Sequence, residues 1–335
     1  MQSFNALKAP FRIYGVPQFD KCGLLERLPL SVREAVPSLS FFGRRVPGAR
    51  LGFRTNSTRF TVTVRFESIG CDVGMALFAC QSAAVYASGR FLGLAFAPDY
   101  DTPVAERTFE KSAETEDILI YLPRNEVITE ITISLEEGAA LESPTPYAHP
   151  VPVVFYGSSI TEGGHCSKMS NVYNALLSRW LQCDYVNLGL SGSARGELPV
   201  ADYINTLDMS ALVIGYDHNA PTVEHLAATH EPFFRRIREK RPTLPILLMS
   251  RPGDCLSPEE TAARRDIVRT TYEHALADGD KYVRFIDGRT FYGNADRDAC
   301  SGDNTHPNDL GMYRIAQVIR PVLAEMLGIE DPAQV

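Results

Sequence analysis

The chain has 335 residues, of which 44% are hydrophobic and 22% are charged. This length exceeds that of one average domain, and the composition is typical of a folded globular protein rather than a disordered or fibrous one. The formal net charge of −8 at pH 7 creates a field that repels phosphate groups, so we expect neither a nucleic acid nor an acidic membrane surface as a partner.

The N-terminal residues do not show a charged segment followed by an apolar core, and no apolar run approaches the ~20 residues that span a bilayer. We therefore expect neither secretion nor membrane insertion. The seven cysteines form no CxxC pair, and their odd number in a long chain favours reduced thiols. They are Cys22, Cys71, Cys80, Cys166, Cys183, Cys255 and Cys300. These features predict a cytoplasmic protein without a bound metal or other cofactor.

The first part of the chain is rich in short β-type segments separated by turn residues. Over residues 59–67 apolar and polar side chains alternate, which predicts a strand with one buried face. Further strands are expected over residues 73–80, 117–123 and 127–135. Several such strands in succession predict a β-sandwich.

A stretch rich in proline and small residues follows at residues 136–152. Proline fixes its backbone angle and lacks an N–H donor, so these prolines are incompatible with a helix or a central strand. They are Pro144, Pro146, Pro150 and Pro152. We place the domain boundary in this stretch, with the β-sandwich at residues 1–148 and a second domain at residues 149–335.

The second domain alternates apolar strands with amphipathic helices. Strands are expected at residues 153–157, 185–189, 211–216, 246–250 and 283–287. Helices are expected at residues 168–182, 196–207, 222–240, 257–278 and 308–327. Continuously apolar strands between helices are typical of a parallel sheet covered on both faces, so we expect a doubly wound α/β fold. In such a sheet the ligand binds beyond the carboxyl ends of the strands.

The turn after the first of these strands has the sequence GSSIT at residues 157–161. A serine at a strand-to-helix turn projects into the crevice where ligands bind, so Ser159 is a candidate nucleophile. Serine and glycine are also common where helices are capped. By itself the pentapeptide is more typical of a structural turn, and the assignment depends on partners elsewhere in the chain.

The sequence DNTHP at residues 303–307 supplies these partners, because it lies between the last expected strand and the last expected helix. A serine hydroxyl needs an imidazole to take its proton and a carboxylate to orient that imidazole. Of the seven histidines, only His306 has an aspartate three residues earlier. We therefore predict a catalytic triad of Ser159, His306 and Asp303. His165 follows the serine too closely to be its base and is expected to line the pocket.

Acyl transfer also needs hydrogen-bond donors for the negative charge that develops on the carbonyl oxygen. Gly192 follows the second strand, and a glycine can bring its backbone N–H close to a ligand. Asn219 follows the third strand, and its side-chain amide can donate to the same oxygen. Each could instead belong to an ordinary turn or helix cap. Because they follow successive strands of one sheet, we predict an oxyanion hole made by the N–H of Ser159, by Gly192 and by Asn219.

Two basic features are not assigned to the site. Arg251 follows the fourth strand on the same rim, and we interpret it as a partner in a structural salt bridge. The basic run at residues 235–241 lies on an expected helix and is interpreted as a solvated face.

The motifs GSSITEGG, NLGLSG, DHNAP and DNTHPNDLGM resemble those of the SGNH, or GDSL-like, hydrolase superfamily. The resemblance covers residues 151 to about 328. It implies the same roles that chemistry suggests for the predicted triad and oxyanion hole, which comprise Ser159, Asp303, His306, Gly192 and Asn219. Two positions depart from the common pattern. Ser158 stands in place of an aspartate, and Asn219 lies two places later than the common asparagine.

The segments RLGFRTNSTRFTVTV and LIYLPRNEVITEITI resemble strands of the N-terminal jelly-roll domain in one branch of this superfamily. The combined architecture is similar to that of carbohydrate acetylesterases, which implies an O-acetylated sugar as the small-molecule substrate. The resemblance therefore predicts a serine esterase for short acyl groups, and it is compatible with a homo-oligomer. Two alternatives remain: a lipase or thioesterase for long acyl chains, and a carbohydrate-binding protein that has lost its activity.

Overall fold

The chain forms two compact units in the computed structural model, which describes residues 1–70, 75–253 and 257–331. The first unit comprises Met1–Leu28, Gly43–Ala148 and Ser167–Ser170. The second unit comprises the other described residues, including Pro29–Phe42, which lie within the expected first domain. This segment belongs to the second unit because its helix α2 (Leu30–Ala35) packs against α7 (Leu198–Ile204). The division into domains at residues 1–148 and 149–335 stays a prediction.

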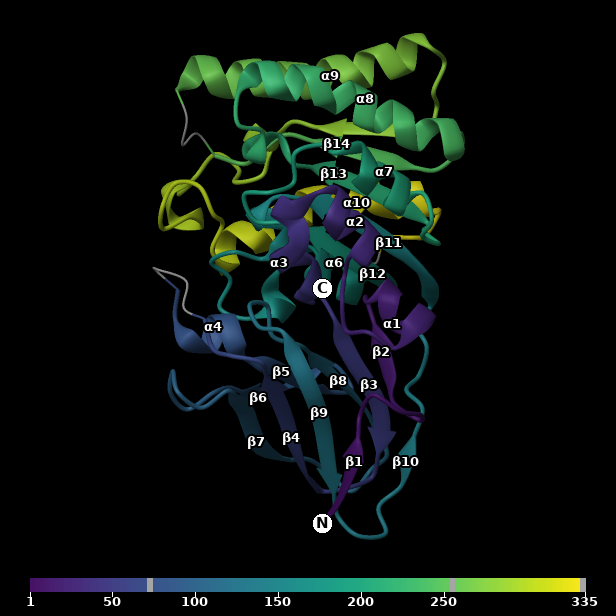
Figure 1. The fold of residues 1–335 in the computed structure, drawn as a ribbon, viewed down its shortest axis with the longest axis vertical. Coiled ribbons are helices and arrows are strands. Elements are labelled where there is room, and N and C mark those ends of the chain that lie inside the picture. The colour runs from purple at the N-terminus through teal and green to yellow at the C-terminus, as the bar shows by residue number, and fades with distance from the viewer. Residues whose placement is uncertain (71–74, 254–256, 332–335) are drawn as a thin grey trace. The chain divides into compact units, whose positions relative to one another are not determined.

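Two antiparallel sheets form the first unit (Figure 1). Their strands are β1 (Gln2–Asn5), β2 (Arg12–Tyr14), β3 (Arg50–Thr55), β4 (Arg59–Phe66), β5 (Ala83–Ala87), β6 (Arg90–Ala95), β7 (Val104–Glu110), β8 (Glu116–Tyr121), β9 (Ile128–Leu135) and β10 (Leu141–Glu142). One sheet has the order β1-β9-β4-β7, and the other has the order β10-β3-β8-β5-β6, with β2 paired to β3. Buried apolar side chains from both sheets form one core, which confirms the expected jelly-roll-like sandwich.

Strand β4 shows how the sequence pattern produces this core. Its apolar residues Phe60, Val62, Val64 and Phe66 are at most 5% exposed. On the other face, Thr61 forms a side-chain hydrogen bond of 2.8 Å with a threonine of β7. The alternation in the sequence therefore becomes one dry face and one polar face.

The expectation of a strand over residues 73–80 is wrong for the part of this segment that the structure describes. Residues 77–81 form a short helix, α4 (Leu77–Gln81), and residues 71–74 lie outside the described residues. The helical residues LFACQ include no β-branched side chain and no alternation of polar with apolar residues, so nothing in them favours a pleated strand. Two further short helices are α1 (Pro17–Cys22) and α3 (Ser40–Arg44).

The second unit contains a five-stranded parallel sheet with the order β12-β11-β13-β14-β15. Its strands are β11 (His149–Gly157), β12 (Cys183–Gly189), β13 (Ala211–Gly215), β14 (Ile246–Met249) and β15 (Val283–Ile286). Its longer helices, besides α7, are α6 (Tyr173–Leu181), α8 (Val223–Lys240), α9 (Pro258–Ala277) and α10 (Asp309–Leu327). Helices α8 and α9 cover one face and α6 and α10 the other (Figure 1), which confirms the doubly wound fold. No described helix is both long and apolar enough to cross a membrane.

Strand β11 is central in the sheet, although it contains Pro150 and Pro152. The expectation that these prolines exclude a central strand is therefore wrong. They lie in an irregular stretch between His149 and Val153, before the pairing with β13 begins at Val153. The carbonyl of Pro152 still accepts a hydrogen bond from the N–H of Ser210. Proline is tolerated here because the regular ladder with β12 is interrupted between His149 and Val153.

Five cysteines of the described chain take part in no disulfide bond: Cys22, Cys80, Cys166, Cys183 and Cys300. Cys71 and Cys255 lie outside the described residues. The prediction of reduced thiols agrees with the structure at the five positions that it describes.

Two glycines at the ends of neighbouring strands let a short helix sit directly on the sheet. A Cβ at Gly189, the last residue of β12, would overlap the backbone of Glu162 in helix α5 (Ser159–Glu162). A Cβ at Gly157, the last residue of β11, would overlap the side chain of Thr161 and the carbonyl of Gly215. The sequence thus leaves room for α5 at the carboxyl edge of the sheet.

We expect Gly189→Ala to destabilise the protein, because backbone atoms of α5 cannot move aside as a flexible side chain can. The expected loss is about 1–3 kcal/mol or more in the free energy of unfolding, measured by urea denaturation. Gly302→Ala is the matched control, since a Cβ there meets no atom within 4 Å. Equal stability of the two variants would contradict this explanation of the close approach.

Candidate active site

Ser159 lies where strand β11 ends and helix α5 begins. Ser158 is the N-cap of α5, and its hydroxyl accepts a hydrogen bond of 3.2 Å from the N–H of Ile160. A capping residue therefore stands where the sequence departs from the common GDS pattern. The first N–H groups of a helix have no acceptor within the helix, so the N–H of Ser159 remains available beside its hydroxyl.

The structure brings the three predicted triad residues into one hydrogen-bonded chain. The Oγ of Ser159 lies 2.8 Å from Nε2 of His306, and Nδ1 of His306 lies 2.7 Å from Oδ2 of Asp303. An ionised carboxylate can only accept, so Nδ1 carries the proton and Nε2 accepts from the serine hydroxyl. This tautomer presents a lone pair to the serine.

The loop before α10 also fixes the charge of Asp303. Its Oδ1 accepts hydrogen bonds from the N–H groups of Thr305 at 2.9 Å and His306 at 2.7 Å. Burial acts to raise the pKa of Asp303, but the hydrogen bonds from the His306 ring and from these two N–H groups outweigh it and hold the pKa well below its ordinary value. The carboxylate is therefore ionised throughout the neutral and mildly acidic range.

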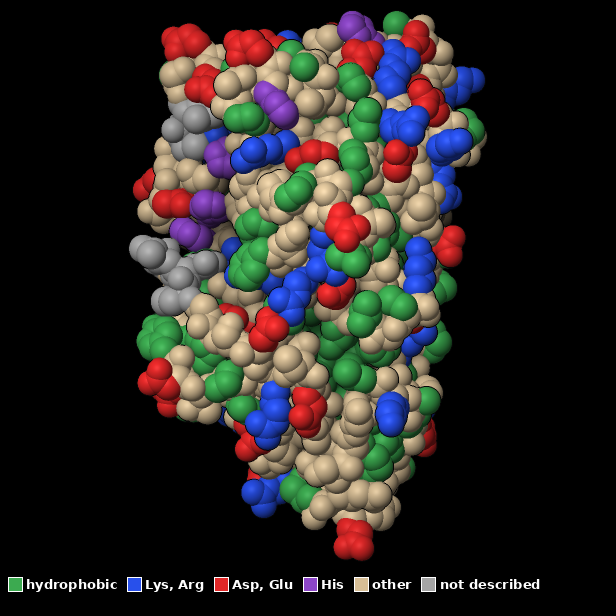
Figure 2. Space-filling view, viewed as in Figure 1, with side chains coloured by type: hydrophobic (Ala, Val, Ile, Leu, Met, Phe, Trp, Pro, Cys, Tyr) green, Lys and Arg blue, Asp and Glu red, His purple; other side chains and the backbone are tan. Residues whose placement is uncertain are grey.

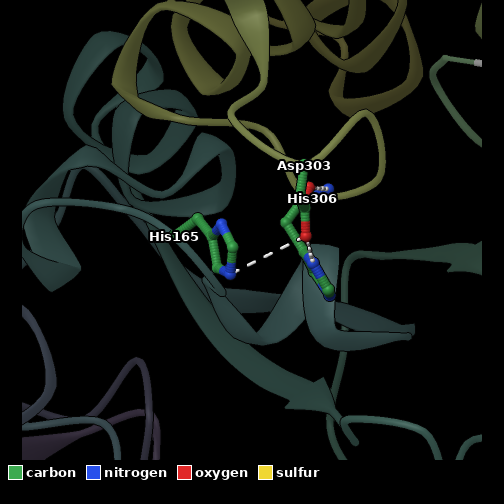
Figure 3. A group of neighbouring side chains, drawn as sticks. All are labelled: His165, Asp303 and His306. Carbon is green, nitrogen blue, oxygen red and sulfur yellow. Dashed lines mark hydrogen bonds and ion pairs between the residues drawn. The ribbon is translucent and has the colours of Figure 1, made fainter. Parts of the chain in front are cut away.

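His165 lies beside Asp303 and His306 (Figure 3), and that it lines a substrate pocket stays a prediction. Its ring stacks on that of His306 with 4.7 Å between centroids, and its Nε2 lies 3.9 Å from Oδ2 of Asp303. Histidine side chains also gather on one side of the molecule in the space-filling view (Figure 2).

These three residues could be considered as ligands of a metal ion, because one donor atom from each lies within 4.8 Å of the others. Two His and one carboxylate form a known zinc set, in which ligand atoms about 2.0–2.1 Å from the metal are roughly 3.3 Å apart. Nδ1 of His306 and Oδ2 of Asp303 are only 2.7 Å apart and share a proton. The donor set therefore fits a hydrogen-bonded acid and base better than a metal centre.

The two other predicted oxyanion donors lie on neighbouring loops. Gly192 has a φ of 65°, in a turn where the N–H groups of Ser193 and Ala194 donate to the carbonyl of Leu190. The side-chain amide of Asn219 donates to this same carbonyl at 2.9 Å. One N–H of the amide thus holds the Gly192 turn, and the second remains for a ligand.

Glu162 ties the Gly192 turn to helix α5. Its carboxylate is fully buried and accepts hydrogen bonds from both the N–H, at 3.1 Å, and the hydroxyl of Ser191. This role was not predicted, because nothing in the sequence indicates that Glu162 and Ser191 meet. The contact positions the turn relative to Ser159, three residues before the glutamate.

The loop after β13 is held by a buried arginine of α9. This loop contains the 3-10 turn η3 (Asp217–Asn219), and Nη1 of Arg264 donates to the carbonyls of Asp217 at 2.7 Å and Ala220 at 2.9 Å. Burial raises the pKa of Asp217, against the hydrogen bond that its carboxylate accepts from the N–H of Arg251 at 3.1 Å. The position of Asn219 therefore depends on buried polar contacts from two other segments.

The interpretation of Arg251 as a salt-bridge partner is wrong. Its guanidinium makes no ion pair with any described residue, and its Nη1 instead donates to Nδ1 of His218 at 2.9 Å. The sequence analysis placed Arg251 on the correct rim but gave no role to His218. A signal was present, since His218 directly precedes Asn219 at the end of a strand.

Comparison with known proteins identifies a family for the second unit. A family model described as the GDSL-like lipase/acylhydrolase family matches residues 151–324. No curated protein matches the chain closely enough to be counted as a relative.

Several solved structures share the fold. A protein from Bacteroides ovatus described as a GDSL-like lipase has 22% identity and a TM-score of 0.89 over 99% of both chains. A salicylyl-acyltransferase from a tetracycline biosynthetic pathway has 21% identity and a TM-score of 0.81 over 97% of both chains. A family two carbohydrate esterase from Clostridium thermocellum, solved with cellohexaose, has 16% identity and a TM-score of 0.63 over 85% of this chain and 94% of that one. At these identities the likeness shows the fold alone.

The low pKa of Asp303 predicts a pH-dependent effect of Asp303→Asn on stability. The folded-state pKa lies below the unfolded one, so the ionised carboxylate stabilises the fold above about pH 4, and this contribution is lost as the pH falls further. Urea unfolding at pH 7 and at pH 3 should therefore show a larger deficit of the variant at pH 7. A deficit that is unchanged or larger at pH 3 would contradict the assigned hydrogen bonds.

Proposed function

Because the chain belongs to the GDSL-like lipase/acylhydrolase family, it is an acylhydrolase, and we propose that it is a serine esterase for short O-acyl groups, acetyl above all, on a carbohydrate. The observation that carries the proposal is the hydrogen-bonded chain from Ser159 through His306 to Asp303. This chain has the donor and acceptor order that activates an alcohol toward a carbonyl.

In the first step, Nε2 of His306 takes the proton of Ser159 while Oγ attacks the carbonyl carbon of the ester. The imidazolium that forms is stabilised by the carboxylate of Asp303, whose hydrogen bond also fixes the ring. When the tetrahedral intermediate collapses, the imidazolium gives its proton to the departing sugar hydroxyl. Water then enters, and its oxygen attacks the acyl carbon while one of its protons passes to Nε2 of His306. When this second tetrahedral intermediate collapses, the bond from the acyl carbon to Oγ of Ser159 breaks, Oγ takes the proton back from His306, and the carboxylic acid leaves.

The oxyanion of the intermediate is assigned to donors on three neighbouring loops. The N–H of Ser159 follows β11, the N–H of Gly192 follows β12, and the amide of Asn219 follows β13. Glu162 and Arg264 hold these loops in place before substrate arrives. Donors that are fixed in advance stabilise developing charge without reorganisation, and each is worth several kcal/mol.

The substrate class rests on the architecture of the whole chain. A jelly-roll-like unit precedes the parallel-sheet unit, and a family two carbohydrate esterase that shares the fold was solved with an oligosaccharide. This likeness supports an acylated sugar as the natural alcohol. Because a shared fold does not determine the substrate, the release of acetate from acetylated oligosaccharides is the test of this assignment.

We expect the purified protein to release acetate from aryl acetates and from acetylated oligosaccharides. Ser159→Ala should lower the rate by about 10³-fold or more, because the nucleophile is lost. Ser210→Ala is the matched control with an unchanged rate, since the Ser210 hydroxyl contacts the carbonyls of Val151 and Pro152 at the other end of the strands.

A chain-length series on aryl esters separates the proposed function from long-chain lipase or thioesterase activity. Rates that fall from acetate to octanoate support the proposal, and rates that rise beyond butyrate overturn the short-acyl assignment. Full activity of Ser159→Ala would overturn the serine mechanism, and no labelling of Ser159 by a fluorophosphonate would leave a non-catalytic binding protein.

A further inference from the structure

His218 lies on the same rim as Ser159. Strands β11 and β13 are neighbours, and Gly157 pairs with Gly215 in their register. Ser159 follows its paired glycine by two residues and His218 follows by three. The N–H of Ser158 also donates to the carbonyl of Gly215 at 3.3 Å. The two loops therefore leave the sheet side by side, and His218 is only partly buried there.

Arg251 determines which nitrogen of His218 carries the proton. Its Nη1 donates to Nδ1 of His218 at 2.9 Å, and a guanidinium has no acceptor atom. Nδ1 must therefore be the unprotonated nitrogen, and the ring is neutral with its proton on Nε2. Within residues 1–70, 75–253 and 257–331, the hydrogen bond of the His218 ring is the one at Nδ1, and Nε2 makes none.

The guanidinium in this contact is buried. The residue is 5% exposed, and its Nε and Nη2 find no hydrogen-bond partner in the described part of the chain. Burying a cation with so little compensation costs free energy. An apolar side chain would fill this position at a lower cost in free energy. A role of Arg251 in the site, through its contact with His218, therefore explains why an arginine is present.

The surrounding charges keep His218 neutral. Burial lowers its pKa to about 3, and the positive charges of Arg251, His306 and Arg264 act in the same direction, whereas Asp303 opposes them. Asp217, its neighbour in η3, is itself buried. A neutral ring matters in this place, because His306 becomes positive when it takes the serine proton, and a second imidazolium nearby would oppose that transfer.

We propose that His218 is a further substrate-contacting residue, whose Nε2–H donates to the carbonyl oxygen of the bound ester beside the amide of Asn219. Arg251 is then a positioning residue that holds the donor tautomer. The inference rests on the proposed function, since it requires an ester whose carbonyl oxygen becomes negative. His218 would supply a donor in the segment DHNAP, where Asn219 lies two places later than the common asparagine.

Steady-state kinetics on an aryl acetate test the donor. His218→Leu should lower kcat by about 10²-fold with little change in KM, because the hydrogen bond strengthens as the oxygen becomes negative. His218→Gln should retain kcat within about tenfold of the wild type, since its amide N–H extends about as far as Nε2. His274→Leu is the control with unchanged kinetics, because His274 is exposed on α9 and contacts Glu231.

Thermal unfolding of each variant identifies a loss that is due to misfolding. A folded His218→Leu with kcat within twofold of the wild type overturns the proposal while the esterase assignment stands. If the wild type itself hydrolyses no ester, the proposed function fails and not this inference alone.

A measurement on the wild type needs no substitution at the histidine. In ¹⁵N NMR of the imidazoles, His218 should show the Nε2–H tautomer, and its Nε2–H proton should shift downfield when a fluorophosphonate places a phosphoryl oxygen at Ser159. Arg251→Met should reduce the population of this tautomer. A proton on Nδ1, or no shift on forming the adduct, overturns the proposal.

Discussion

The hydrogen bond between Ser159 and His306 joins two loops that are 147 positions apart in the chain. It depends on the parallel sheet, because only parallel strands bring all their carboxyl ends to one edge. Ser159 follows the first strand of the sheet in chain order and His306 follows the last, and the order β12-β11-β13-β14-β15 places the strand before Ser159 between two neighbours. Asp303 orients the ring of His306 in this contact.

Buried polar contacts do most of this alignment. Glu162 reaches from α5 to the turn after β12, and Arg264 reaches from α9 to the turn after β13. Both residues are at most 3% exposed, and a buried charge that lost its partners would be costly. The loops that carry Gly192 and Asn219 are therefore fixed by residues that do not themselves contact an ester.

Different surroundings give the ionisable groups of the site different charges. Asp303 accepts several hydrogen bonds and is held ionised, whereas His218 is partly buried beside a guanidinium and is held neutral. His306 therefore has a fixed negative partner in Asp303, and the ring of His218 adds no positive charge to the site. The same residue types thus acquire different charges from burial and hydrogen bonding.

The sequence by itself determined the fold class, the family resemblance and the three residues of the hydrogen-bonded chain. The alternation in β4 and the apolar run at the end of β11 are patterns that a short stretch of sequence shows by itself. The family model confirms the resemblance. Only the tertiary structure decided that residues 77–81 are helical, that Pro150 and Pro152 fit a central strand, and that Arg251 contacts a histidine. Periodicity reports which side of an element is buried, but it does not say which distant side chain a buried polar group will meet. The partners of Glu162, Arg251 and Arg264 therefore follow from three-dimensional packing and leave no pattern in the chain.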